Sequence, residues 1–582
     1  PYGVKYWELG VETRLFSAAG FNGWNDYGKK FAIRSRAMKA IDPTIKTGAV
    51  GCDSPLEETF KFKPWTENVR TVVEANGGAI DFWQLHAYPP GASLLMRGVD
   101  LQSNGAYVEV KHNFQATDTY TFTMYATGSW PNAFPPGGGS AAIRVSVDGV
   151  PVEWPAGSGQ QNLSMSLRST SSSTTLAANT RAWTMPLTQG VHAIRFEKVS
   201  GTCQTDIFGQ TTCATAEIHP FIFYQRAGDG FQKHFDLKDD PMVHYLAQSG
   251  AIGLGEQFRL HDKFVPAGEP EIPVYLTEFN MGIEEPNAVE TTLRTPGSDL
   301  REGMGLWTLF QKAVEKGLEV AIVHHFFDDN WFGMVEGVAY DRQFGDRGRS
   351  DPRRRPTFHA FKILRRHLKP VQVQSAATTP SVSIVKGGGY KLGYGGAFTN
   401  SVPMVEAIVT KTADGRELHI SLMNRDMENA QTVSFDIAGF GPIEPRGTLD
   451  LLWSPEIGAN NEPEAGVCSH PELGCPEMVK IETYALDGVG ASFSYRMPRH
   501  SIAAIVLRRS DVDWTPPAQV SDAVAGLFGG FVKLGWSPTE DADLAGYNIY
   551  RSTIPWGPYD YRVAQVSAGA RAWTDPAASA GN

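Results

Sequence analysis

The chain has 582 residues, with 52 Lys and Arg against 63 Asp and Glu, and a formal net charge of −11. This length exceeds what a single hydrophobic core supports, so several domains are expected. The acidic balance argues against a nucleic-acid partner and offers no basic face to an anionic membrane. No apolar run approaches the roughly 20 residues of a membrane helix.

Apolar runs alternate with amphipathic segments in two parts of the chain. Strands are expected at Val4–Leu9, Ile45–Gly51, Ile80–His86, Ile272–Thr277 and Leu318–Phe326. Helices are expected at Gly28–Ala40, Trp65–Ala75, Asp240–Phe264, Asp299–Gly317 and Pro356–Leu368. This order predicts a partial (β/α)8 barrel of five βα units over residues 1–91 and 229–370. A closed barrel needs eight units, so we expect the first three βα units to precede this chain. A non-barrel α/β fold is the alternative.

Residues 92–228 have a different character, because polar and apolar residues alternate there with a period of two. The clearest runs are Tyr107–Val110, Thr119–Tyr125, Ile143–Val147 and His192–Phe196. This pattern predicts a β-sandwich inserted into a barrel loop.

Two further β-domains are expected after Pro370. Residues 371–509 alternate again and predict a C-terminal β-sandwich. Thr515–Pro517 marks a linker, and residues 518–582 predict another small sandwich.

The five cysteines include two close pairs, Cys203 with Cys213 and Cys468 with Cys475, and each pair brackets a turn-rich stretch. Local disulfides in an oxidising compartment are the favoured interpretation, which predicts a secreted protein. Unlinked thiols in a cytosolic protein are the alternative. The spacings are too wide for a Cys-x-x-Cys metal site, and Cys52 is left over.

Two glutamates lie at the ends of expected strands, where barrel enzymes place their chemistry. Glu12 closes the run from Val4, and Glu278 lies near the end of the run from Ile272. Two carboxyls held about 5 Å apart would hydrolyse a glycosidic bond with retention. We assign Glu278 as the nucleophile and Glu12 as the acid/base. A helix cap or a rim ion pair is the plain structural alternative for each.

Four other residues are expected to bind substrate at the same rim. His86 and Tyr88 share one face of their strand and would orient Glu278 or bind a hydroxyl. Asn280 follows the nucleophile, and Trp331 would stack on a sugar ring. A packing or capping role is the alternative for His86 and Tyr88.

No cofactor is expected, and retaining hydrolysis requires no metal. The nearby His and Asp residues are therefore not taken as a metal site; these are His324, His325, Asp328 and Asp329. In the insert, four aromatic residues would form either a sugar platform or part of the core: Trp130, Phe134, Trp154 and Trp183. The insert is also a candidate for calcium binding, with no ligands fixed by the sequence.

Three motifs resemble those of α-L-arabinofuranosidases of glycoside hydrolase family 51. Trp7–Glu12 resembles the Trp-Glu-x-Gly-Asn-Glu acid/base motif, and Leu276–Asn280 resembles the nucleophile strand. Asp81–Tyr88 resembles the strand-six pattern that ends in His-x-Tyr. The resemblance covers residues 1–91 and 229–509. The insert is similar to carbohydrate-binding modules of families 6 and 35, and the tail resembles fibronectin type III modules.

The resemblance implies an exo-acting, retaining α-L-arabinofuranosidase that acts on plant cell-wall polysaccharide. One departure stands at Val11, where the family has an Asn whose amide contacts the sugar 2-hydroxyl. Losing such a contact costs several kcal/mol in the transition state. The alternatives are a β-xylosidase or endo-β-glycanase of the same clan, or a catalytically weak or inactive carbohydrate-binding protein.

Overall fold

The computed structural model describes most of the chain, in segments. These are residues 4–10, 23–51, 65–87, 99–101, 103–129, 140–166, 180–205, 211–218, 221–228, 233–237, 240–256, 258, 271–279, 281, 299–323, 327–328, 334–336, 354–384, 401–459, 461, 478–515, 517–541, 544–552 and 561–579. Contacts divide the chain into two compact units, Pro1–Arg509 and Ser510–Asn582.

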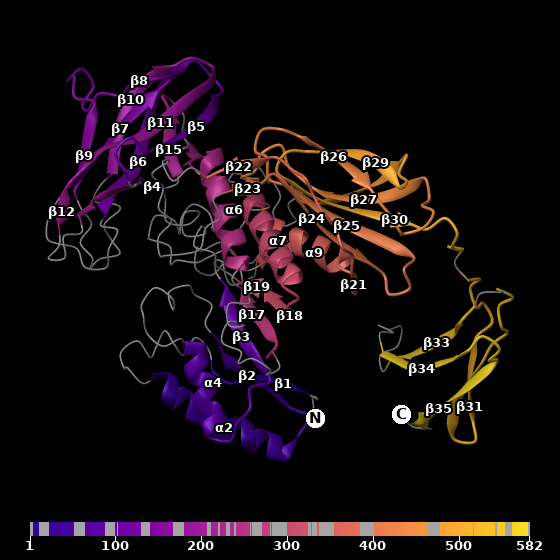
Figure 1. Ribbon diagram of the computed structural model, residues 1–582. Coiled ribbons are helices and arrows are strands. Elements are labelled where there is room, and N and C mark those ends of the chain that lie inside the picture. The colour runs from indigo at the N-terminus through magenta and orange to yellow at the C-terminus, as the bar shows by residue number, and fades with distance from the viewer. Residues whose placement is uncertain are drawn as a thin grey trace. The chain divides into compact units, whose positions relative to one another are not determined.

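The first unit contains a sheet of five parallel strands in the order β1-β2-β3-β17-β18 (Figure 1). The strands are β1 (Tyr6–Glu8), β2 (Lys46–Val50), β3 (Phe82–Ala87), β17 (Val274–Phe279) and β18 (Val320–Val323). The helices of this region are α2 (Gly23–Ile41), α4 (Trp65–Ala75), α6 (Pro241–Gly255), α7 (Leu300–Glu315) and α9 (Pro356–His367). None of the helices in the described segments is long and apolar enough to cross a membrane.

The expected strands and helices are present, and the largest error in extent concerns α6. The sequence predicted a helix as far as Phe264, whereas α6 ends at Gly255 and Glu256 is its C-cap. Three glycines stand in the last six residues of α6, at positions 250, 253 and 255, and glycine is unfavourable in helices. Gly255 also leaves room for Lys312, whose side chain would lie 2.3 Å from a β-carbon at that position.

The two faces of the parallel sheet differ in what covers them. One face packs on the helices in an apolar core that includes Phe31, Val69, Leu85, Leu276 and Leu306. The other face carries a cluster of three aromatic rings, which we call the aromatic face: the Phe82 and Tyr275 rings stack with centroids 4.5 Å apart, and Tyr6 lies 6.0 Å from Tyr275.

Strands β4 to β11 and β14 to β16 form two antiparallel sheets that share one core. The first sheet has the order β16-β15-β6-β14-β4, with β10 paired to β6. Its strands are β4 (Val99–Leu101), β6 (Asp118–Ser129), β10 (Thr180–Leu187), β14 (Thr215–Ile218), β15 (Phe221–Arg226) and β16 (Lys233–Asp236). The second sheet has the order β5-β11-β7-β8, with β9 paired to β7. Its strands are β5 (Tyr107–Phe114), β7 (Ser140–Val147), β8 (Val150–Pro151), β9 (Asn162–Ser166) and β11 (Gly190–Gly201).

Two of the tryptophans considered for a sugar platform belong to this core. Trp154 and Trp183 are 8% and 6% exposed, and their rings lie 5.4 Å apart. The Trp183 ring stacks on Phe122 at 4.9 Å. Their burial excludes them from a surface platform. Trp130 and Phe134 lie outside the described residues.

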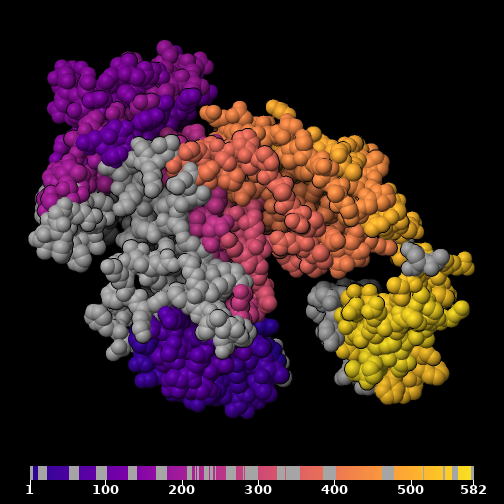
Figure 2. Space-filling view, viewed as in Figure 1, coloured from indigo at the N-terminus to yellow at the C-terminus, as the bar shows by residue number. Residues whose placement is uncertain are grey.

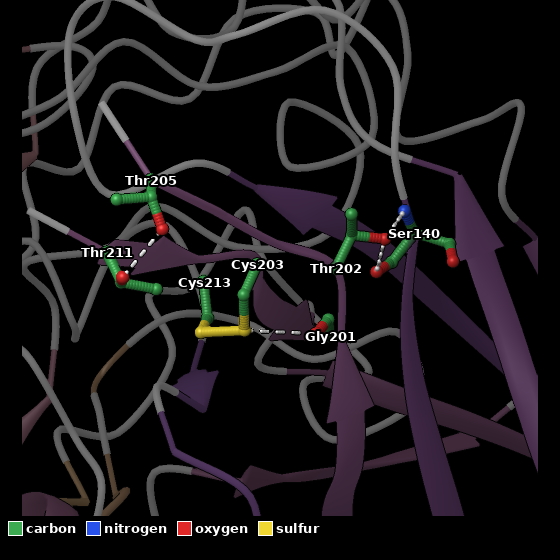
Figure 3. The surroundings of a disulfide bond; sticks show 7 residues. All are labelled: Ser140, Gly201, Thr202, Cys203, Thr205, Thr211 and Cys213. Carbon is green, nitrogen blue, oxygen red and sulfur yellow. Dashed lines mark hydrogen bonds between the residues drawn. A yellow bond between two sulfur atoms is a disulfide. The ribbon is translucent and has the colours of Figure 1, made fainter. Parts of the chain in front are cut away.

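A disulfide joins Cys203 to Cys213 across the hairpin of β12 (Cys203–Thr205) and β13 (Thr211–Cys213) (Figure 3). The Thr205 and Thr211 hydroxyls hydrogen-bond at 2.8 Å two residue pairs further along the same hairpin (Figure 3). This predicted bond is confirmed. Cys52, Cys468 and Cys475 lie outside the described residues.

Asp240 links this β-sandwich to helix α6. One carboxylate oxygen accepts the N–H of Met242 at 2.7 Å and so caps the helix. The other oxygen accepts the N–H of Glu109, on β5, at 2.9 Å. The same buried carboxylate therefore holds the start of the helix and one strand of the sandwich.

The C-terminal part of the first unit is a second sandwich. Its main sheet has the order β21-β24-β25-β30-β27-β28: β21 (Val371–Gln372), β24 (Val405–Lys411), β25 (Glu417–Asn424), β30 (Ser501–Arg508), β27 (Arg446–Leu452) and β28 (Ile481–Asp487). One face packs against the pair β26 (Gln431–Asp436) and β29 (Ser492–Met497), where Phe435 and Phe493 stack at 4.4 Å. The other face packs on α6, α7 and α9 in a core that includes Trp307, Ile363 and Met423. In the space-filling view, the outer surfaces of the helices and of this sandwich are in contact (Figure 2). Short pairs complete this unit: β22 (Ser381–Ser383) with β23 (Ser401–Pro403), and β19 (Phe327–Asp328) with β20 (Val335–Glu336).

A buried polar network crosses the boundary between the helices and this sandwich. The Arg425 guanidinium is fully buried and pairs with Glu406. It also donates to Gln248 of α6 at 3.2 Å and to Thr308 of α7 at 2.9 Å. Burial would raise the pKa of Glu406, but the charges of Arg425 and Lys312 outweigh burial and hold it below its usual value.

The second unit consists of a three-stranded and a two-stranded sheet. The first contains β31 (Val524–Phe528), β32 (Phe531–Gly535) and β35 (Ala572–Ser579), and the second pairs β33 (Gly546–Arg551) with β34 (Tyr561–Ser567).

Arg425→Met should lower the free energy of unfolding by about 3–5 kcal/mol, because Glu406 would remain buried without its main partner. Replacing both residues by Met should recover most of that loss, since no orphaned charge remains. The measurement is urea denaturation of the two single variants and the double variant. Arg446→Met, which breaks an exposed pair with Asp487, is the control and should change little. A double variant as unstable as Arg425→Met would contradict the argument.

Acid should destabilise the first unit through its buried histidines. Burial lowers the pKa of His500 to about 4 and that of His419 to about 4. The unfolded chain binds protons near pH 6.5 and the folded chain does not, so stability is fully present above pH 6.5 and is lost as the pH falls toward 4. The slope is about 1.4 kcal/mol per pH unit for each group. His500→Asn should flatten the curve of unfolding free energy against pH, because Asn tolerates the left-handed φ of 33° there and does not titrate. An unchanged slope in this variant would refute the assignment.

Candidate active site

Strand β17 has one extra residue next to its neighbour β3. Leu276 pairs with Leu85 and Glu278 pairs with His86, so Thr277 forms a bulge. In a regular strand Glu278 would share the face of Leu276, which packs on the helices. The bulge turns Glu278 onto the aromatic face instead, and bulges of this kind often re-aim side chains beside active sites.

The bulge brings Glu278 next to His86. The Nδ1 atom of His86 lies 3.5 Å from a carboxylate oxygen of Glu278, and the two side chains are 9% and 22% exposed. Both residues are near the carboxyl ends of parallel strands, the edge where α/β proteins bind ligands. The arrangement presents a partly accessible carboxylate beside a buried imidazole, which suits a nucleophile with a partner that orients it.

The floor below this pair is closely packed. Gly48 of β2 lies in register with Phe82 of β3. A β-carbon on Gly48 would meet the Phe82 ring at 2.1 Å, so glycine is what allows this ring to lie across β2. The stacked Tyr275 donates its hydroxyl to Glu319 at 3.1 Å, and burial followed by that carboxylate raises the pKa of Tyr275 to about 12.

The end of β1 lies beside the same strands. The Leu9 N–H donates to the Gly48 carbonyl at 3.1 Å. The Tyr27 hydroxyl donates to the Leu9 carbonyl at 2.9 Å, and the Gln84 amide donates to the Gly10 carbonyl at 2.6 Å. The backbone at the carboxyl end of β1 is thus held by α2, β2 and β3.

The structure brings together two of the six predicted site residues, His86 and Glu278. The other four lie outside the described residues: Glu12, Tyr88, Asn280 and Trp331. Sequence reasoning did not find Gln84, although alternation places it on the face of His86 two residues earlier. It also did not find Tyr27, because the helix was expected to begin at Gly28 and begins at Gly23.

Among the segments that the structure describes, no group of three or more His, Cys, Asp or Glu is arranged to hold a metal ion.

Known proteins resemble parts of this chain, although no family model matches it. A stretch of 111 residues is 33% identical to the exo-α-(1→6)-L-arabinofuranosidase of Bifidobacterium longum, covering 17% of this chain and 20% of that protein. A stretch of 108 residues is 32% identical to the intracellular exo-α-(1→5)-L-arabinofuranosidase of Streptomyces lividans, covering 18% of this chain and 16% of that protein. The chain thus spans a fifth or less of the length of these two curated relatives.

Among solved structures, an α-L-arabinofuranosidase from Thermotoga maritima in complex with arabinose covers 87% of this chain and 67% of its own length. The identity is 15% and the TM-score 0.45, a likeness too low to bear on chemistry. The sequence matches show that the chain is similar to arabinofuranosidases, and the expected resemblance is confirmed to that extent.

Gly48→Ala should lower the free energy of unfolding by about 1–3 kcal/mol, because the added methyl group must displace the Phe82 ring from its stack on Tyr275. Gly490→Ala is the matched control in the same unit, since nothing lies within 4 Å of a β-carbon there. Thermal and urea unfolding of both variants provide the test. Equal stability of the two variants would show that the floor is not closely packed.

Proposed function

We propose that the chain carries the catalytic centre of a retaining glycoside hydrolase, an exo-acting α-L-arabinofuranosidase of the family 51 kind that acts on plant cell-wall polysaccharide. The observation that carries the proposal is Glu278, turned by the Thr277 bulge to lie beside His86 at the carboxyl end of a parallel sheet. The stretch that is 33% identical to a Bifidobacterium longum exo-arabinofuranosidase supports the substrate class.

The reaction proceeds by double displacement. The Glu278 carboxylate attacks the anomeric carbon while Glu12 gives its proton to the leaving oxygen, and a glycosyl–enzyme ester forms. Glu12 then takes a proton from water, which attacks the ester and frees Glu278. His86 orients the nucleophile, Tyr88 and Asn280 bind sugar hydroxyls, and the Trp331 ring stacks on the sugar. No cofactor takes part.

We propose that the five parallel strands belong to an eight-stranded barrel formed by residues 1–91 and 229–370 with three further βα units. Apolar side chains on the two edge strands support this: Tyr6 and Trp7 on β1 are 60% and 42% exposed, and Ile322 on β18 is 51% exposed. Edge strands with exposed apolar residues are normally covered.

The remaining parts fit a secreted enzyme with several modules. Residues 92–228 would bind carbohydrate, with calcium as a candidate ligand. Residues 371–509 support the barrel, and residues 518–582 form a module of the fibronectin type III kind. The disulfide between Cys203 and Cys213 supports an oxidising compartment, whereas the Streptomyces lividans relative is named as intracellular.

Two other functions are alternatives to the proposed one. A β-xylosidase or endo-β-glycanase would use the same two glutamates with different sugar-binding loops. A weak or inactive carbohydrate-binding protein is favoured by Val11, whose side chain cannot replace the hydrogen bond that Asn gives to the sugar 2-hydroxyl.

The full-length protein should hydrolyse an aryl α-L-arabinofuranoside faster than an aryl β-xyloside. Glu278→Ala should lower the rate by about 10⁴-fold or more, because the nucleophile is lost. Glu12→Ala should lower it by about 10²–10⁴-fold, as expected for a general acid. The measurement is initial rates with purified variants, and Glu74→Ala on the outer helix α4 is the control.

Preference for the xyloside would favour the first alternative. With no turnover of either substrate, labelling of Glu278 by a mechanism-based inhibitor would identify an endo-acting enzyme. Polysaccharide binding with no labelling would identify a binding protein.

A further inference from the structure

Two side chains hold the backbone where β1 ends. The Tyr27 hydroxyl accepts the N–H of Val50 at 2.8 Å and donates to the carbonyl of Leu9 at 2.9 Å. The Gln84 amide nitrogen donates to the carbonyl of Gly10 at 2.6 Å. The two consecutive carbonyls that follow β1 are therefore bound by side chains from α2 and from β3.

The backbone at Gly10 makes these bonds decisive for the direction of the chain. Its φ of 115° is a conformation that glycine adopts readily and other residues rarely do. A glycine has no side chain to restrict the turn, so the hydrogen bonds to the Leu9 and Gly10 carbonyls contribute to holding it. Glu12 is two residues further along the sequence and lies outside the described residues.

A glutamine at position 84 is unfavourable for the stability of the fold. Its side chain is 2% exposed, and its Oε1 has no hydrogen-bond partner among the described residues. Burying an unpartnered amide oxygen costs about 1–3 kcal/mol. A methionine would fill a similar volume without that cost, so the hydrogen bond to Gly10 is what the glutamine adds.

Gln84 also lies two residues before His86 on β3, on the same face of the sheet. His86 lies within 3.5 Å of Glu278 through its Nδ1 atom. One strand therefore contacts the nucleophile with one side chain and the end of β1 with another. A retaining hydrolase needs its two carboxyls at a fixed separation of about 5 Å.

We propose that Gln84, assisted by Tyr27, is a positioning residue for the acid/base Glu12. The inference rests on the proposed function. Gln84 itself touches no substrate atom; it acts through the backbone of Gly10.

The test compares two leaving groups in the full-length protein carrying Gln84→Met. A methyl α-L-arabinofuranoside needs a proton from the acid to release its alcohol, whereas a 2,4-dinitrophenyl arabinofuranoside releases a stable phenolate unaided. We expect kcat/KM for the methyl glycoside to fall by about 10–10²-fold, the range that a misplaced catalytic group costs. For the dinitrophenyl glycoside kcat/KM should change by less than about 3-fold, and azide should restore any loss of kcat, because azide attacks the glycosyl–enzyme without a general base.

Gln311→Met is the matched control. Gln311 is also 2% exposed with an unpartnered Oε1, but it lies on α7 beside Glu315 and Glu406. This control should leave both kcat/KM values unchanged while changing thermal stability about as much as Gln84→Met does.

Tyr27→Phe tests the same pair of contacts independently. The ring keeps its stack on Trp65 at 5.7 Å and loses only the hydroxyl. Tyr245→Phe on α6 is its control, since it likewise removes a hydroxyl that accepts a backbone N–H, that of Met427. Tyr27→Phe should show the same dependence on leaving group, and Tyr245→Phe should not.

Glu12→Ala, measured alongside, distinguishes a failure of the proposed function from a failure of the positioning role of Gln84. Absence of leaving-group dependence in Glu12→Ala would overturn the proposed function. Leaving-group dependence in Glu12→Ala, with equal losses or no losses on both substrates in Gln84→Met and Tyr27→Phe, would overturn the positioning role alone.

Discussion

The pairing of β3 with β17 is the constraint on which the candidate site depends. In each parallel strand, one set of alternate side chains packs against the helices and the other set points to the opposite face of the sheet. One extra residue at Thr277 lets β17 satisfy this rule on both sides of the bulge. Leu276 and Phe279 both reach the helix core, and the glutamate between them turns away from it. The packing of the helices thus decides where the carboxylate lies.

The helices behind β17 are fixed in turn by the C-terminal sandwich. Helices α6 and α7 contribute residues both to the core against the parallel sheet and to the core against the sandwich. Apolar contacts leave room for sliding, whereas a buried charge does not, because it requires its partners at definite positions. Arg425 has such partners on α6, α7 and β24, namely Gln248, Thr308 and Glu406. The ion pair therefore helps to fix the positions of α6 and α7 relative to the C-terminal sandwich, in addition to the apolar contacts between them.

Sequence periodicity predicted the strands and helices well, and predicted the details of the site less well. The runs around Val274 and Leu306 have a periodicity that indicates a strand and a helix directly, so their secondary structure can be predicted from the local sequence alone. The bulge at Thr277 cannot be predicted from the sequence, because Leu-Thr-Glu-Phe is compatible with a regular strand as well as with a bulged one. Whether Trp183 lies in the core or on the surface depends on the sheet that packs against it. The ion-pair partner of Arg425, Glu406, is 19 residues away in sequence, and its hydrogen-bond partners Gln248 and Thr308 lie on two helices. Glu278 was found from its place in a strand, and its contact with His86 required the register.

The double role of Asp240 has a mechanical consequence. A carboxylate that caps α6 and also holds β5 is one residue on which both the inserted sandwich and the helix depend. Loss of the Asp240 carboxylate would remove a hydrogen bond from each of them at once. The edge of the sandwich and the start of a helix that backs β17 are therefore coupled, so a change in one is transmitted to the other.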